Sequence, residues 1–160
     1  MSASLIPPAF LEALREIYHA LEGTDVVWVV TGSLGLAIKG IPVTPHDIDI
    51  QTDRAGVEAF ARLFAENMVT PPHLWESEYT RSWFAAFEIK GIPVEVMGDM
   101  QHRDEDGFWD DPPNLEANRI IIQVAEMAIP TLSLEFEEDA YRRTGRRAKA
   151  DMIAQYLRTC

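Results

Sequence analysis

The sequence predicts an α/β or α+β fold in which helices cover one sheet. A short run of apolar, mostly β-branched residues at 26–30 is typical of a strand that is buried on both faces. Residues 47–52 alternate between polar and apolar side chains, as a strand with one buried face does. Segments with apolar residues at helical spacing lie before, between and after these strands, which favours a helix-covered sheet over a helical bundle or a sandwich.

The first half of the chain is expected to alternate helices and strands. Apolar residues recur at helical spacing over 10–21, behind two prolines that a first helical turn tolerates, and Gly23 ends this helix. Ser33 is expected to cap a short helix over 34–39, and Asp53 is expected to cap the next helix.

The second half is expected to hold a hairpin, one further strand and two helices. Strands over 80–90 and 92–98 are joined by the short turn Lys90-Gly91, although lysine is not a favoured first residue of such a turn. A stretch over 99–116 contains seven acids and one basic residue and is expected to be a solvated loop. The remaining elements are a strand over 119–124, a helix from Ser133 to about 144 and a final helix to about 158.

Length and composition favour one soluble domain. The chain has 160 residues, 47% apolar and 25% charged; we expect a single domain over 1–160, with a core at about 24–125 and C-terminal helices at about 133–158. The net charge of −12 argues against a broad nucleic-acid-binding surface, because such surfaces neutralise phosphates with lysine and arginine. The one cysteine, Cys160, excludes an intrachain disulfide and a cysteine-based zinc site. The sequence shows neither a secretory signal nor an apolar run of membrane-spanning length, so a cytoplasmic protein is expected.

Two aspartates separated by one residue are the first candidate for a functional site. In Asp47-Ile48-Asp49 both carboxylates point to one face of a strand, because successive side chains alternate. Neighbouring carboxylates repel each other and are stabilised by a cation, and magnesium prefers oxygen ligands of this kind. A similar acidic group at 104–106 lies in the polar loop and is expected only to face water.

The dipeptide Gly32-Ser33 lies between the buried strand and the short helix. Glycine lets a phosphate approach the backbone closely, and the free amides at a helix start attract anions. By itself the dipeptide is an ordinary strand-to-helix turn. Upstream of an aspartate pair, it becomes a candidate phosphate-binding turn.

A third acid, Glu95, lies within the apolar strand 92–98. If Lys90-Gly91 forms a two-residue turn, Glu95 lies opposite Ala86, whose small side chain leaves room for an ion. Glu88 is the rival third ligand, and a solvent-facing role for Glu95 is the alternative.

Together these pieces resemble the signature of polymerase-β-type nucleotidyltransferases: Gly32-Ser33, then Asp47-Ile48-Asp49, then Glu95 on a later strand. The short chain is similar to bacterial minimal and antibiotic-type members, and the resemblance is strongest over 26–98. It implies a mixed sheet covered by helices, a Gly-Ser turn that holds nucleotide phosphates, and aspartates that bind two Mg²⁺ ions. The third acid would share a metal ion or help to deprotonate the acceptor.

The implied reaction is the attack of an acceptor hydroxyl on the α-phosphorus of a nucleoside triphosphate, with pyrophosphate as the leaving group. The triphosphate is expected to be ATP or another nucleoside triphosphate, with AMP the most favoured transferred group, and the acceptor a small molecule or a protein. Two metal ions would stabilise the attacking and leaving oxygens, and Glu95 is the candidate general base. The alternative is a catalytically inactive nucleotide-binding or regulatory module, or a toxin–antitoxin component, on the same fold. The presence of all three acids favours an enzyme.

A cluster of basic residues near the C-terminus has two interpretations. Five of the chain's 14 basic residues fall between 142 and 149. They could complement a helix end at the surface, or Arg146 and Arg147 could bind the triphosphate. Related families often carry an Arg-x-Lys-Asp run here; in this chain Ala150 takes the place of the acid, and Asp151 follows one position later.

Overall fold

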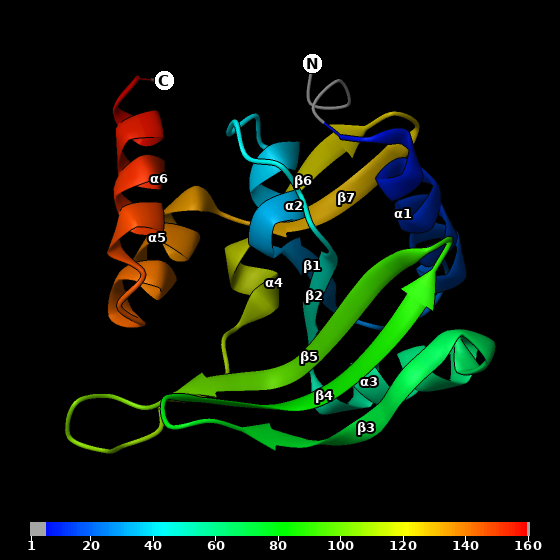
Figure 1. Cartoon of the computed structure of the whole chain (residues 1–160), viewed down its shortest axis with the longest axis horizontal. Coiled ribbons are helices and arrows are strands. Elements are labelled where there is room, and N and C mark those ends of the chain that lie inside the picture. The colour runs from blue at the N-terminus through cyan, green and yellow to red at the C-terminus, as the bar shows by residue number, and fades with distance from the viewer. Residues whose placement is uncertain (1–5, 160) are drawn as a thin grey trace.

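The computed structural model describes residues 6–159, which contain a seven-stranded mixed sheet with helices packed against it (Figure 1). The strand order is β3-β4-β5-β2-β1-β7-β6. The expected fold class is thereby confirmed. No helix in the described part of the chain is long and apolar enough to cross a membrane. Cys160 lies outside the described residues.

Three adjacent strands at the centre of the sheet position the candidate acids. β1 (Trp28–Thr31) runs antiparallel to β2 (Ile48–Thr52), and β2 runs parallel to β5 (Ile92–His102). The parallel pairing places Asp49 directly beside Glu95. Two acids that are distant in sequence therefore become neighbours through sheet register alone.

The hairpin expected around residue 90 is confirmed. β4 (Thr80–Ile89) pairs antiparallel with β5 through a two-residue turn at Lys90 and Gly91. Both turn residues have positive φ, 53° and 78°, which matches the twist that a two-residue hairpin favours. The register puts Ala86 opposite Glu95, as the sequence predicts.

Two strands lie where the sequence predicts none. β3 (Met68–Glu76) forms one edge of the sheet, and β7 (Met127–Leu132) lies between β1 and β6 (Arg119–Val124). β3 contains two consecutive prolines, and β7 contains Pro130. Proline donates no backbone hydrogen bond, so its presence argues against a strand. β3 accommodates its prolines at an edge, with shifts in its register to β4.

The polar loop is shorter than predicted. β5 continues to His102, and a short helix, α4 (Leu115–Asn118), lies near the end of the expected loop. Asn114 caps α4 by accepting a hydrogen bond from the amide of Ala117 at 3.0 Å. The sheet also extends past residue 125, because β7 pairs in parallel with β1.

α1 (Pro8–Leu21) and α3 (Arg54–Leu63) pack on the apolar face of the sheet, and the 3-10 turn Ala65–Asn67 follows α3. Asp53 caps α3 as expected, accepting a hydrogen bond from the amide of Gly56 at 2.7 Å. Both helices share one buried core with the inward-facing residues of β2 and β5. Its members include Ala13, Leu14, Ile17, Ile48, Ile50, Val57, Phe60, Val94 and Val96.

α2 (Gly32–Ile38) begins two residues earlier than predicted. Thr31 is the N-cap residue, and its side chain makes no capping hydrogen bond. Ser33 lies inside the first turn, where its hydroxyl accepts a hydrogen bond from the amide of His46 at 3.4 Å. The prediction that Ser33 caps this helix is therefore wrong, because the chain turns into the helix at Gly32.

α5 (Leu134–Arg143) and α6 (Arg147–Thr159) form a helical pair that Figure 1 shows at the opposite end of the sheet from α1. Ser133 caps α5 as expected, accepting from the amide of Phe136 at 3.1 Å. The pair packs against α2 through a small buried cluster of Leu36, Ile41, Leu134 and Ile153. The C-terminal helices thus lie beside the element that begins with the Gly-Ser dipeptide.

Candidate active site

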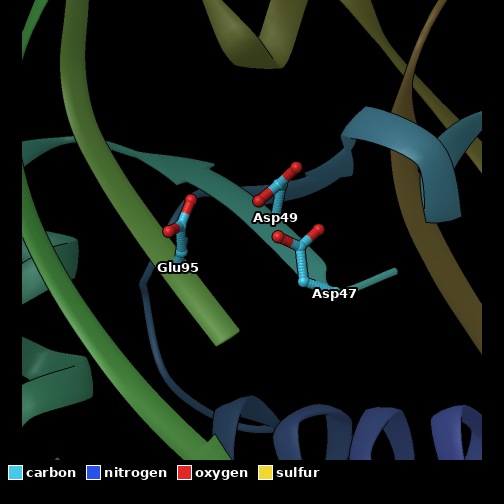
Figure 2. A group of neighbouring side chains, drawn as sticks. All are labelled: Asp47, Asp49 and Glu95. Carbon is cyan, nitrogen blue, oxygen red and sulfur yellow. The ribbon is translucent and has the colours of Figure 1, made fainter. Parts of the chain in front are cut away.

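The structure brings the three candidate acids together. Asp47 immediately precedes β2, Asp49 lies within β2, and Glu95 lies on β5. One carboxylate oxygen of each residue lies within 4.8 Å of the others. Figure 2 shows the carboxylates directed into a shared space from the two neighbouring strands. Glu88, the rival third acid, lies opposite Pro93 near the hairpin turn, is exposed, and is not part of this group.

Strand alternation explains why the acids share a face. Ile48 and Ile50 are fully buried on the opposite side of β2, as Val94 and Val96 are on β5. These four side chains pack beneath α1 and α3 and fix the orientation of both strands. Burial of the apolar set therefore turns the acids away from the main core.

Gly32 lies directly against the acid group. Its φ is 67°, and a Cβ at this position would overlap the Oδ2 atom of Asp49. The position requires glycine for two reasons, since L side chains disfavour this φ and the carboxylate occupies the space that a side chain would need. The backbone of the Gly-Ser turn and the carboxylate of Asp49 consequently form one surface.

The acids destabilise one another's ionised forms. Burial, with smaller contributions from the neighbouring Asp47 and Glu95, raises the pKa of Asp49 to about 7. Burial and the nearby Asp47 also raise the pKa of Glu95. A divalent cation would relieve this repulsion, so the donor set fits a metal ion such as Mg²⁺.

A cavity of about 400 Å³ adjoins the acids. Gly32 and Asp49 line one side of it, and Glu137, Tyr141 and Arg146 line the side formed by the C-terminal helices. A cavity of this size suits a small ligand. Its other lining residues are Thr31, Gln51, Ser77, Tyr79, Thr80, Met97, Met100, His102, Leu132, Phe136, Ala140 and Thr144.

The basic cluster divides into residues that face the acids and residues that do not. Arg146 lines the cavity, and its guanidinium lies 5.0 Å from the ring centre of Tyr141. The ammonium of Lys149 lies 5.4 Å from the same ring centre. Both cations act electrostatically to lower the pKa of Asp49. Arg147, by contrast, is exposed at the start of α6 and is not among the residues that line the cavity.

Two other arginines of the cluster are held in surface ion pairs. Arg142 lies 2.9 Å from Glu138 and 3.0 Å from Asp151. Arg143 lies 2.8 Å from Asp139 and 3.2 Å from Asp110. For these two arginines the surface interpretation of the cluster holds.

The sequence analysis missed one buried pair beside the site. The hydroxyl of Thr31 donates a hydrogen bond of 2.6 Å to the Oε1 atom of Glu137, which is only 3% exposed. Helical spacing predicts that Glu137 is buried, because it lies three residues after Leu134 and four before Tyr141, on the inward face of α5. An acid on that face is expected to have a buried partner.

Comparisons with known proteins agree with this architecture. A family model for aminoglycoside-2''-adenylyltransferases matches residues 13–155. A solved structure from Thermotoga maritima, assigned provisionally as a nucleotidyltransferase, is 42% identical; the match covers 97% of this chain and 96% of that chain, with a TM-score of 0.85. A search of curated proteins gave no match.

A more distant structure shows the same fold. ANT(2'')-Ia, solved in complex with adenylyl-2''-tobramycin, is 12% identical, with 93% of this chain and 88% of that chain covered and a TM-score of 0.55. The fold and these neighbours define the chain as a nucleotidyltransferase-type enzyme. Because the family model covers most of its length, the chain belongs to the aminoglycoside-2''-adenylyltransferase family.

Proposed function

We propose that this protein transfers AMP from ATP to a hydroxyl group of a small molecule, using Mg²⁺ held by Asp47, Asp49 and Glu95. The observation that carries the proposal is the convergence of these three carboxylates within 4.8 Å beside the Gly32 turn. The family match supports an adenylyl group as the transferred unit. The activity is proposed for the single domain over 1–160.

The acids would hold the metal, and the turn would hold the phosphates. Gly32 and Ser33 form the first turn of α2, beside Asp49, and the free backbone amides of a helix start attract anions. Bound Mg²⁺ would neutralise phosphate charge and stabilise the developing charge on the leaving oxygen. Arg146 and Lys149 bring positive charge to the same space from the C-terminal helices. Of the two adjacent arginines, Arg146 lines the cavity and Arg147 does not, which supports the larger role for Arg146.

Glu95 is the proposed general base. Its carboxylate lies within 4.8 Å of those of Asp47 and Asp49, where an acceptor hydroxyl bound beside the metal would be within reach. It would take the proton of the acceptor hydroxyl as that oxygen forms a bond to the α-phosphorus. The bond between the α-phosphorus and the bridging oxygen then breaks, and pyrophosphate leaves.

The family and the small cavity support a small molecule as the acceptor. The product bound to ANT(2'')-Ia is an adenylylated small molecule, and the 400 Å³ cavity admits a ligand rather than a folded protein. A protein hydroxyl is the competing acceptor. An inactive nucleotide-binding or regulatory module, or a toxin–antitoxin component, is the competing function.

Incubation with triphosphates labelled at the α-phosphate, Mg²⁺ and a library of hydroxyl-bearing acceptors tests the proposal. We expect label from ATP to appear on a small molecule, and a chelator or Asp49→Asn to abolish transfer. Label on protein would change the acceptor class. A nucleotide-induced rise in melting temperature without transfer to any acceptor would support the inactive module.

A further inference from the structure

The C-terminal helical pair forms hydrogen bonds at both ends of the short helix α2. At its start, the hydroxyl of Thr31 donates a 2.6 Å hydrogen bond to Glu137 of α5. At its end, the hydroxyl of Tyr156 of α6 donates a 3.0 Å hydrogen bond to the backbone carbonyl of Lys39. A single helical pair therefore contacts the two residues that flank α2, Thr31 and Lys39.

Two buried groups of opposite charge type, Lys39 and Glu137, lie at the same interface. Among residues 6–159, the Oε2 atom of Glu137 and the Nζ atom of Lys39 are both buried, and neither has a hydrogen-bond partner. Burial raises the pKa of Glu137, and the positive charge of Lys39 opposes that effect. Burial likewise lowers the pKa of Lys39, and the negative charge of Glu137 opposes that effect. The attraction between the two groups therefore offsets part of the cost of burying them across the interface between α2 and α5.

Thr31 is the position from which this link reaches the site. It pairs with Asp49 across the β1–β2 ladder and immediately precedes Gly32. Gly32 approaches Asp49 so closely that a Cβ would not fit. Any shift of α2 against the sheet would consequently separate the phosphate turn from the carboxylate beside it.

We propose that Glu137 and Tyr156 are positioning residues that clamp α2, so that the C-terminal helices fix the Gly32-Ser33 turn against Asp49. The role in nucleotide binding rests on the proposed function. A helix of only seven residues has few internal hydrogen bonds, and isolated helices of that length are unstable. Contacts with other elements at both ends would fix the position of α2.

Matched substitutions test the clamp. Thr31→Val and Tyr156→Phe each remove one hydroxyl that bonds across the interface, whereas Thr31→Ser keeps the hydroxyl. Thr131→Val and Tyr18→Phe are the controls. The hydroxyl of Thr131 donates to the carbonyl of Ile120, and that of Tyr18 accepts from the amide of Ala128, so these two bonds involve neither α2 nor the residues that flank it.

Hydrogen exchange of the nucleotide-free protein is the first measurement. We expect Thr31→Val to raise exchange at the amides of α2 about tenfold, with Thr31→Ser close to wild type and both controls unchanged at α2. Glu137→Gln keeps an acceptor for Thr31 but loses the charge, and it should give a smaller rise. Equal α2 exchange in Thr31→Val and Thr131→Val would overturn the clamp, whatever the protein does with nucleotide.

Titration of ATP with Mg²⁺ and steady-state kinetics are the second measurement. We expect Thr31→Val to weaken binding about fivefold and to raise KM more than it lowers kcat, while Thr131→Val leaves both unchanged. Looser α2 exchange with unaltered ATP affinity would overturn the role in nucleotide binding. A wild-type protein that does not bind ATP would overturn the proposed function, and hydrogen exchange would still decide the clamp.

Discussion

Two acidic groups of nearly the same composition occupy different environments in this molecule. Asp47 and Asp49 converge with Glu95 at the centre of the sheet. Asp104 and Asp106 lie in the loop after β5, where Asp104 accepts hydrogen bonds from the amides of Asp106 and Phe108, both at 2.9 Å. The carboxylate of Asp104 therefore accepts hydrogen bonds from the backbone of its own turn. The carboxylates at the sheet instead repel one another beside a cavity.

The difference shows that the spatial neighbours of an acidic motif, rather than its sequence, determine what it can bind. In the loop, water and backbone amides already solvate the charge. At the sheet, the register adds a third acid from β5 and places Gly32 against the second. Only the sheet group concentrates negative charge that a bound cation would offset.

The largest expected effect separates the two groups by activity. Asp49→Asn removes one charge from the proposed metal-binding set and should lower nucleotidyl transfer about a thousandfold. Asp104→Asn retains an acceptor for its turn and should leave transfer within about twofold of wild type. Initial rates of transfer with labelled ATP measure both variants. Comparable losses in the two would contradict the distinction between the groups.

Two glycines sharpen the same comparison. Gly32 and Gly107 both have positive φ, 67° and 87°, but only Gly32 has another residue's atoms where its Cβ would be. Gly107→Ala should cost only the backbone strain, about 1 kcal/mol of unfolding free energy. Gly32→Ala adds the overlap with Asp49 and should cost about 3 kcal/mol, together with loss of ATP binding. Urea denaturation monitored by circular dichroism measures the difference, and equal costs would show that the close approach is unimportant.

The raised pKa of Asp49 predicts a pH-dependent stability in the metal-free protein. The pKa of Asp49 is about 7 in the folded protein, whereas the ordinary pKa of an aspartate is 3.8, so the folded state binds more protons between these values. Stability should therefore fall as pH rises from about 4 to about 7 and level off above that, by at most about 4 kcal/mol.

Thermal unfolding of the chelator-treated protein across this pH range measures the effect. Asp49→Asn should flatten the curve and raise the melting temperature at pH 8, because its side chain carries no charge. Asp104→Asn is the matched control and should keep the wild-type slope. An unchanged slope in Asp49→Asn would mean that other groups set the pH dependence.

The smallest effect separates two adjacent arginines. Both are exposed, but Arg146 lines the cavity and Arg147 does not. A charge-assisted hydrogen bond contributes roughly 1.5–3 kcal/mol, so Arg146→Gln should weaken ATP binding about tenfold or more and AMP binding less. Arg147→Gln should change ATP affinity by less than twofold. Isothermal titration with both nucleotides decides between them, and the reverse ranking would reassign the phosphate contact to Arg147.

Local signals in the sequence predicted much of the fold. Alternation identified β2, and the positions of Asp53 and Ser133 predicted two helix starts that the structure confirms. β3 and β7 were not predicted, because their prolines oppose strand formation. In the folded protein, long-range pairing overrides that local preference. The start of α2 was predicted two residues too late. Serine is a more favoured N-cap residue than threonine, so Ser33 was chosen over the threonine that precedes Gly32.

The candidate site was predictable where it depends on alternation and register. The two aspartates share a face by strand geometry, and the hairpin turn put Glu95 opposite Ala86. The bond between Thr31 and Glu137 was not predictable, because it joins β1 to α5, and the docking of α5 depends on tertiary packing. Sequence likewise could not distinguish Arg146 from Arg147, since the direction of each side chain depends on how α6 begins.

The parallel pairing of β2 with β5 also has a kinetic consequence. Hairpins such as β4–β5 close through two residues and form within microseconds. The chain between Asp49 and Glu95 contains α3, β3 and β4. The two acids therefore become neighbours only when this long segment closes into a loop. We therefore expect the group of three acids to form late in folding. A refolding protein should regain its hairpin spectroscopic signals before it regains the ability to bind Mg²⁺.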